Sequence, residues 1–128
     1  MIRLVKIGTA ALVGAGIGAV SMDTLRAQAK PPAYAIAEVT VKDRDPYMKE
    51  FLPARAKAIH DAGGTYIVRG GDPKTVAGKP PGQRIIVVQF ENMDKLIAFT
   101  QSAGFKDSEA IGEKYAKIRI YGVEGIPR

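Results

Sequence analysis

Cysteine and tryptophan are absent from this 128-residue sequence, and histidine occurs only once. Without cysteine the chain has no disulfide, no iron–sulfur or cysteine-based zinc site, and no thiolate nucleophile. A single histidine does not build the usual histidine-rich metal site, so we expect no bound metal. The sequence also lacks a phosphate-binding glycine motif placed between a strand and a helix, and we expect no cofactor.

The net charge of +6 is spread along the chain. Residues 1–29 contribute +2, from Arg3, Lys6 and Arg26 against Asp23, which leaves +4 for the remainder. Nucleic-acid-binding domains gather Lys and Arg on one face, often among stacking aromatic residues. The interspersed charges here predict a solvated surface, and we expect no nucleic-acid partner.

Residues 1–29 have the order of regions found in a secretory signal peptide. Arg3 and Lys6 form a basic start, residues 7–20 are uncharged and apolar, and an Ala-x-Ala pattern ends at Ala29. The apolar run is shorter than the roughly 20 residues that span a bilayer. We therefore expect cleavage after Ala29, a periplasmic or secreted protein, and no stable membrane insertion afterwards. An uncleaved N-terminal anchor is the alternative.

The remaining residues, 30–128, are expected to form one domain. Period-two alternation or continuous β-branched runs predict four strands, at residues 33–41, 65–69, 84–90 and 117–123. The run at 84–90 is the most apolar, which indicates a central position in a sheet. A loop rich in Gly, Pro and Lys separates the second and third strands.

Helical spacing of apolar residues predicts two helical regions between these strands. The first opens at Asp45-Pro46, has an irregularity at Pro53, and ends at Gly63-Gly64. The second is capped by Glu91-Asn92 and is interrupted at residues 102–104.

The resulting β-α-β-β-α-β order predicts an α+β, ferredoxin-like fold with one four-stranded antiparallel sheet. Helices on one face of that sheet would leave the other face uncovered. An exposed apolar face of several hundred Å² is unusual for a monomer. We therefore expect a homodimer formed through the sheet face.

Three stretches carry a resemblance to a known family. Residues 62–71 read AGGTYIVRGG, residues 84–93 fit R-x-x-V-x-x-F-x-x-x, and residues 119–125 fit R-x-Y-x-V-E-G. With these stretches, the segment from Tyr34 to Gly125 resembles the DUF1330 family of the dimeric α/β-barrel superfamily. The resemblance implies a ferredoxin-like dimer. The family has no assigned activity, so the resemblance implies a fold rather than a reaction.

Arg69 and Arg84 flank the long loop between the second and third strands. An antiparallel hairpin brings such positions close together, and two guanidinium groups can clamp a carboxylate or a phosphate. The alternative is that each arginine pairs with a local acid such as Asp72 or Glu91.

Glu38 and His60 are the candidates for a general base. Glu38 lies in the middle of the first strand, where an unpaired carboxylate would have a raised pKa. The alternative for Glu38 is an ion pair with Arg119 on a neighbouring strand. His60 lies near the end of the first helix, where it is either a base or a residue favourably placed against the helix dipole.

Tyr66 and Phe99 are candidates for the wall of an apolar cavity between sheet and helices, or else are plain core residues. We expect an exported homodimer that binds a small apolar or weakly anionic molecule in that cavity. One alternative is an enzyme like the cofactor-independent monooxygenases and isomerases of the same superfamily, with Glu38 or His60 as base. The other is a purely structural or interaction dimer.

Overall fold

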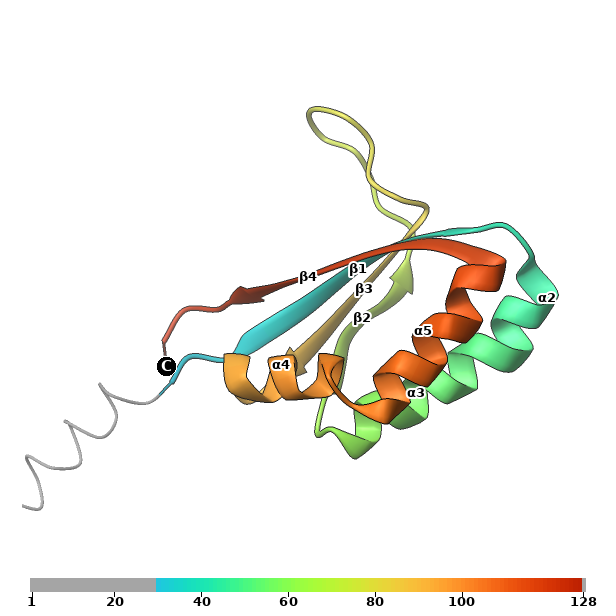
Figure 1. Cartoon of the computed structure of the whole chain (residues 1–128). Helices are drawn as coiled ribbons and strands as arrows, with labels where there is room; N and C mark the ends of the chain where they lie inside the picture. Colours follow the sequence, from blue (N-terminus) through green and yellow to red (C-terminus); the bar gives the residue numbers. More distant parts are fainter. Residues whose placement is uncertain (1–29, 128) are drawn as a thin grey trace, which may run out of the picture. The chain divides into compact units, whose positions relative to one another are not determined.

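One antiparallel sheet of four strands organises the domain (Figure 1). The computed structural model describes residues 30–127, so the predicted signal peptide lies outside the described residues. The strands are β1 (Ala33–Val41), β2 (Thr65–Gly71), β3 (Arg84–Phe90) and β4 (Ala116–Glu124). Their order in the sheet is β2-β3-β1-β4, which places β1 and β3 in the centre. The predicted α+β, ferredoxin-like fold is confirmed.

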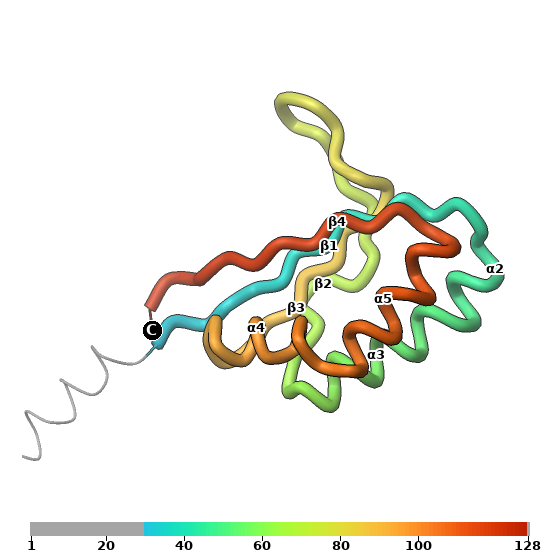
Figure 2. The backbone as a smooth tube through the Cα atoms, viewed as in Figure 1, coloured from blue at the N-terminus to red at the C-terminus, as the bar shows by residue number. Residues whose placement is uncertain are grey.

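The helices all lie on one face of this sheet (Figure 1). They are α2 (Arg44–Pro46), the π-helix η1 (Tyr47–Phe51), α3 (Leu52–Asp61), α4 (Met93–Thr100) and α5 (Ala103–Tyr115). Helices α3 and α5 run side by side beneath the sheet (Figure 2). Within the described part of the chain, no helix has the length and apolar character needed to cross a membrane.

The first helix differs from the prediction at its start. It begins at Arg44 rather than at Asp45-Pro46, and the side chain of its N-cap residue, Asp43, makes no capping hydrogen bond. Backbone hydrogen bonds hold the start of this helix instead, because the amides of Lys42 and Asp43 both donate to the carbonyl of Tyr115.

The irregularity predicted at Pro53 is present one turn earlier. Pro53 has no amide hydrogen to donate to the preceding turn. The backbone widens into the π-helix η1 just before it, and α3 begins at Leu52 with Pro53 in its first turn.

The other helix ends follow the predicted chemistry. The side chain of Asn92 accepts a hydrogen bond from the Lys95 amide at 3.0 Å and caps α4. Ser102 interrupts the helical region because its side chain caps α5, accepting from the Phe105 amide at 3.1 Å. Gly63 follows α3 with φ +81°, a left-handed conformation that glycine adopts without strain.

The core lies between the sheet and the helices and has two parts. Phe90 and Phe99 pack together in the first, with ring centroids 5.2 Å apart. Tyr47 and Phe51 stack in the second, also at 5.2 Å. Phe90 and Tyr47 are each 1% exposed, so both parts exclude water. The space between the two parts is the candidate site.

Candidate ligand-binding site

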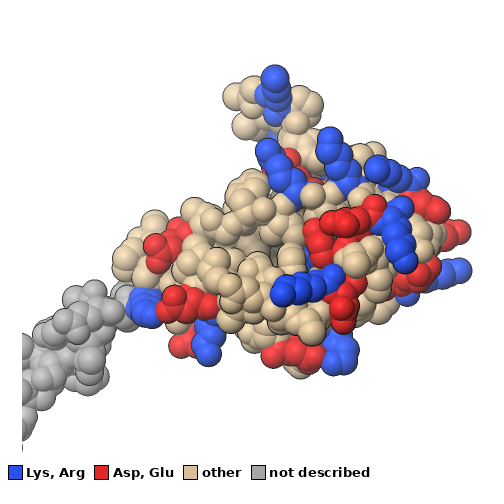
Figure 3. Space-filling model, viewed as in Figure 1, with Lys and Arg blue, Asp and Glu red and all other residues tan. Residues whose placement is uncertain are grey.

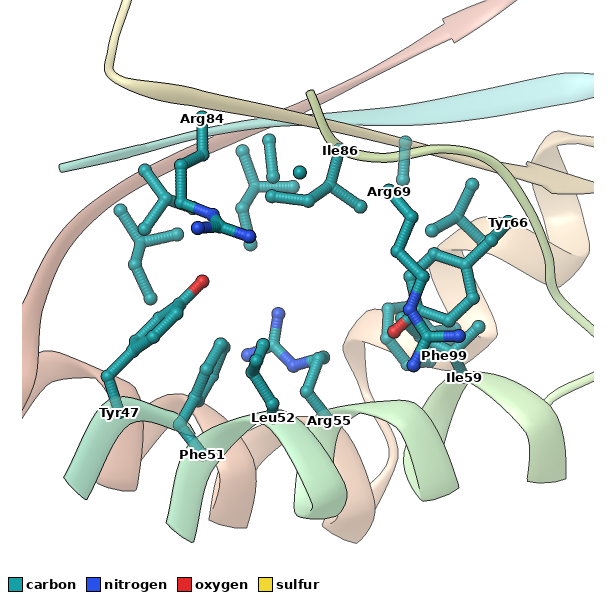
Figure 4. A pocket seen from close by; sticks show the side chains of 17 residues that line it. Tyr47, Phe51, Leu52, Arg55, Ile59, Tyr66, Arg69, Arg84, Ile86 and Phe99 are labelled. Atoms are coloured by element: carbon teal, nitrogen blue, oxygen red, sulfur yellow. The ribbon is translucent and has the colours of Figure 1, made fainter. Parts of the chain in front are cut away.

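A pocket of about 220 Å³ lies between the sheet and the helices. Its wall is mostly apolar, with Val39, Ile86 and Ile118 from the strands and Phe51 and Phe99 from the helices. Figure 4 shows Ile86 facing the helices across the pocket. Figure 3, drawn from the same side as Figure 1, shows a hollow between α4 and β4 that is bordered mainly by uncharged residues. The pocket is therefore a partly enclosed apolar chamber.

Three arginines project into this chamber, and no Asp or Glu is among its lining residues. Arg69 and Arg84 come from the sheet, and Arg55 comes from α3 on the opposite side (Figure 4). Apolar surroundings strengthen electrostatic interactions relative to water. The charge of the pocket thus favours an anion.

Arg84 is the arginine whose hydrogen bonding is incomplete. Its Nε is buried and has no hydrogen-bond partner. Within residues 30–127 no carboxylate forms an ion pair with this side chain, including Asp72 and Glu91, the local acids considered above. A buried donor without a partner is costly, by about 1–3 kcal/mol. A ligand that accepts this hydrogen bond would remove the cost.

Gly70 makes the room in which Arg84 lies. Its φ is +75°, and a Cβ built there would lie 2.6 Å from Nη2 of Arg84. Glycine suits this position for two reasons: it adopts the left-handed backbone without strain, and it leaves the Arg84 guanidinium group room to lie where it does.

Arg69 reaches the pocket because β2 is irregular. Register shifts occur between Tyr66 and Val68 and again between Arg69 and Gly71. Strict alternation would place Tyr66 and Arg69 on opposite faces of the sheet, but the first shift returns Arg69 to the face of Tyr66. The Arg69 guanidinium then lies 4.5 Å from the centre of the Tyr66 ring. Arg69 is exposed and also lines the pocket, so it lies at the pocket's edge.

Arg55 was not singled out from the sequence. Its Nε donates to Ser108 Oγ at 2.9 Å, and Nη2 donates to Glu109 Oε1 at 2.5 Å. The guanidinium carbon also lies 5.0 Å and 4.6 Å from the ring centres of Phe51 and Phe105. These contacts fix a buried cation in place, and its charge is offset by Glu109.

Tyr47 is the second functional candidate that sequence reasoning missed. Its hydroxyl points toward Arg84 across the pocket (Figure 4). Burial raises the pKa of Tyr47, with Arg84 and Arg55 acting in the opposite direction. The phenol is therefore protonated near neutral pH and can donate a hydrogen bond. Tyr47, Phe51, Arg55 and Ile59 recur every four residues, and this spacing is the signal that would have identified Tyr47 and Arg55.

Tyr66 and Phe99 both line the pocket, as proposed. Burial raises the pKa of Tyr66, so this phenol is also neutral near pH 7. Phe99 is at the same time a core residue, because its ring packs against Phe90 and lies 5.1 Å from the ring centre of Phe105.

Glu38 lies on the other face of the sheet, away from the pocket. It forms an ion pair with Arg119, which is the alternative considered above, and its Oε1 accepts from the Gly82 amide at 3.0 Å. The hydrogen bond from Arg119, followed by that from Gly82, lowers the pKa of Glu38. A raised pKa was expected only for an unpaired carboxylate, so the expectation of a pocket base at Glu38 is not met in a single chain.

His60 is exposed near the end of α3 and does not line the pocket. Its position fits the alternative of a helix C-terminal residue, and the expectation of a pocket base is again not met in a single chain. Within residues 30–127 no three His, Asp or Glu side chains gather as a metal site.

Comparison with known proteins identifies the family. The family model for a domain of unknown function, DUF1330, matches residues 32–126. The chain belongs to the DUF1330 family. The resemblance seen in the glycine–arginine stretch is thereby confirmed. None of the curated proteins matches the sequence.

The DUF1330 domain is similar to several solved structures at low sequence identity. A protein of unknown function from Rhodopseudomonas palustris has a TM-score of 0.59 and 10% identity, covering 83% of this chain and 92% of its own. A protein from Bacteroides thetaiotaomicron, described as a possible oxidoreductase, has a TM-score of 0.51 and 15% identity, covering 76% and 100%. A dimeric ferredoxin-like protein of unknown function from Bacteroides fragilis has a TM-score of 0.50 and 13% identity, covering 73% and 96%. These likenesses show the fold alone.

Proposed function

We propose that the domain binds a small organic molecule with an apolar body and a weakly anionic group, in the pocket between sheet and helices. The observation that carries this proposal is the buried, unpartnered Nε of Arg84 in a pocket lined by arginines and no acid. An engineered cavity of about 150 Å³ holds benzene. At about 220 Å³ the pocket is of a size for roughly one ring with a carboxylate.

Titration calorimetry with benzoate tests this proposal. We expect the wild-type protein to bind benzoate, and Arg84→Gln to weaken binding about tenfold or more, because one charge-assisted hydrogen bond is lost. Arg44→Gln is the matched control, since it removes the same charge from an exposed position outside the pocket. Equal affinity of Arg84→Gln and wild type would contradict the proposed site.

We also propose that the protein is a homodimer formed through the bare face of the sheet. Ile67, Val68, Tyr121 and Val123 are exposed large hydrophobic residues on β2 and β4, between 38% and 52% exposed. By their register Val68, Tyr121 and Val123 lie on the bare face, and exposed apolar area of this kind favours a partner surface. The similar protein from Bacteroides fragilis is described as dimeric, which supports a dimer without indicating which face forms it.

Sedimentation equilibrium tests the dimer. Val123→Lys places a charge on the proposed interface and should give a monomer. Ile126→Lys is the control, because Ile126 follows β4 in the C-terminal tail and is 86% exposed. A monomeric wild-type protein would overturn the proposed dimer.

Export remains part of the proposal and rests on residues 1–29. N-terminal sequencing of protein recovered from the periplasm or medium should begin at Lys30. A start at Met1 would support the uncleaved anchor instead.

The enzyme alternative has less support than binding. A cofactor-independent monooxygenase or isomerase with Glu38 or His60 as base requires that residue beside the ligand. In a single chain neither lines the pocket. The structural-dimer alternative predicts that no small anion binds, so the benzoate titration also tests it.

A further inference from the structure

We propose that the pocket selects dianions, namely a small aromatic dicarboxylate or a phosphate monoester, over monoanions of the same size. This inference rests on the proposed function and concerns the charge of its ligand. Of the three arginines in the pocket, Arg55 is paired with Glu109. Arg69 and Arg84 pair with no carboxylate of residues 30–127. The pocket therefore carries two positive charges that the described chain leaves uncompensated.

These two charges lie on the same face of neighbouring strands. Arg69 is opposite Ile86, and Arg84 precedes Ile86 by two residues, so the two arginines form a diagonal pair. Arg84 is also held close to β2, because its guanidinium group packs against Gly70. Both arginines line one pocket of about 220 Å³, so one small ligand can contact both.

The two guanidinium charges share one apolar pocket, whose wall strengthens their mutual repulsion. A monocarboxylate neutralises one charge and leaves the other. A ligand with two negative charges on adjacent positions neutralises both. The neutral phenol of Tyr47 faces the same space from the helix side and adds a hydrogen-bond donor (Figure 4). The two arginines favour the dianion, and Tyr47 can donate to either ligand.

Calorimetric titration of the full-length protein with three probes tests this inference. Benzoate, phthalate and phenyl phosphate share one benzene ring and differ in charge. The titrations are made at about pH 8, above the second pKa of a phosphate monoester near 6. We expect phthalate, phenyl phosphate or both to bind about tenfold or more tightly than benzoate. Phthalate alone would indicate a dicarboxylate ligand, and phenyl phosphate alone a phosphate monoester.

The same titrations with the variant Arg69→Gln are the second part of the test. This substitution should weaken binding of the preferred dianion about tenfold more than it weakens binding of benzoate, because benzoate needs only one of the two cations. Arg69→Lys keeps the charge and should retain the preference for the dianion. Arg69 is exposed, so both variants should fold, which circular dichroism checks.

Two outcomes overturn the inference, and they can be told apart. If benzoate binds as tightly as both dianions, or if Arg69→Gln changes the affinity for all probes equally, the pair Arg69 and Arg84 does not select a dianion and the proposed function stands. If no probe binds to the wild-type protein, the proposed function fails and the inference fails with it.

Discussion

Gly70→Ala is the substitution that best separates folding from ligand binding in this protein. Gly70 has φ +75°, and a non-glycine residue in the left-handed region costs about 1–2 kcal/mol. The added Cβ would also lie 2.6 Å from Nη2 of Arg84 and 3.2 Å from its Cζ and Nε. The guanidinium group is the end of a flexible side chain, so it moves at little cost. We expect a total stability loss of about 1–2 kcal/mol.

Gly63→Ala supplies the matched control for the backbone cost. Gly63 has φ +81°, and a Cβ built there has no neighbour within 4 Å. Its stability loss should therefore equal that of Gly70→Ala, which urea denaturation of both variants measures. The two variants should differ in binding. Displacing the Arg84 guanidinium removes a hydrogen bond to an anion worth about 1.5–3 kcal/mol, which is roughly a tenfold to hundredfold loss of benzoate affinity.

The reasoning is refuted if Gly70→Ala and Gly63→Ala bind benzoate with the same affinity. A double-mutant cycle adds a stricter condition. Gly70→Ala should weaken binding in the wild-type background but not in the Arg84→Ala background, because Arg84 is the group through which Gly70 acts. A further loss in the Arg84→Ala background would show that Gly70 contributes to the pocket in another way.

Three further substitutions test the fold. The hydrogen bond from Arg119 lowers the pKa of Glu38 below its ordinary value of 4.5. The ionised carboxylate therefore stabilises the folded protein above pH 4.5. This contribution to the free energy of unfolding is lost as the pH falls through the lower folded pKa. Urea denaturation between about pH 3 and 6 should show a smaller acid-induced loss for Glu38→Gln than for wild type; identical pH dependence would contradict the ion pair. Phe90→Ala should lower the free energy of unfolding by about 3–5 kcal/mol, because the side chain is 1% exposed, and a loss below about 1 kcal/mol would contradict that packing. Gly112→Ala should lower the melting temperature, because the added Cβ would lie 2.7 Å from Phe51. Overpacking costs about 1–3 kcal/mol, whereas alanine gains about 1 kcal/mol in helix propensity. A higher melting temperature would contradict the contact with Phe51.

The strands were accessible to sequence reasoning because their local signals agree with the tertiary structure. β3 has its predicted bounds, since a continuous β-branched run between polar residues has no competing interpretation. The start of the first helix was harder to predict. Asp45-Pro46 is a good local start signal, but backbone hydrogen bonds to the distant carbonyl of Tyr115 select an earlier start.

The candidate site was predictable only where side-chain position follows from a regular period. Alternation along β1 already separates Glu38 from the apolar face that the helices cover. The same alternation fails for Arg69, because two register shifts in β2 change which face each residue occupies. Arg55 and Tyr47 interrupt an apolar stripe with polar atoms, and only the packed structure shows that these atoms meet over one pocket.

The two register shifts in β2 have a consequence for how the protein associates with other chains. β2 is an edge strand, and a regular edge presents evenly spaced amides and carbonyls to which another strand can add. In β2 the shifts break that spacing twice within seven residues. An incoming strand would therefore find too short a matching run to pair with. The irregularity that turns Arg69 toward the pocket also disfavours growth of the sheet into larger aggregates.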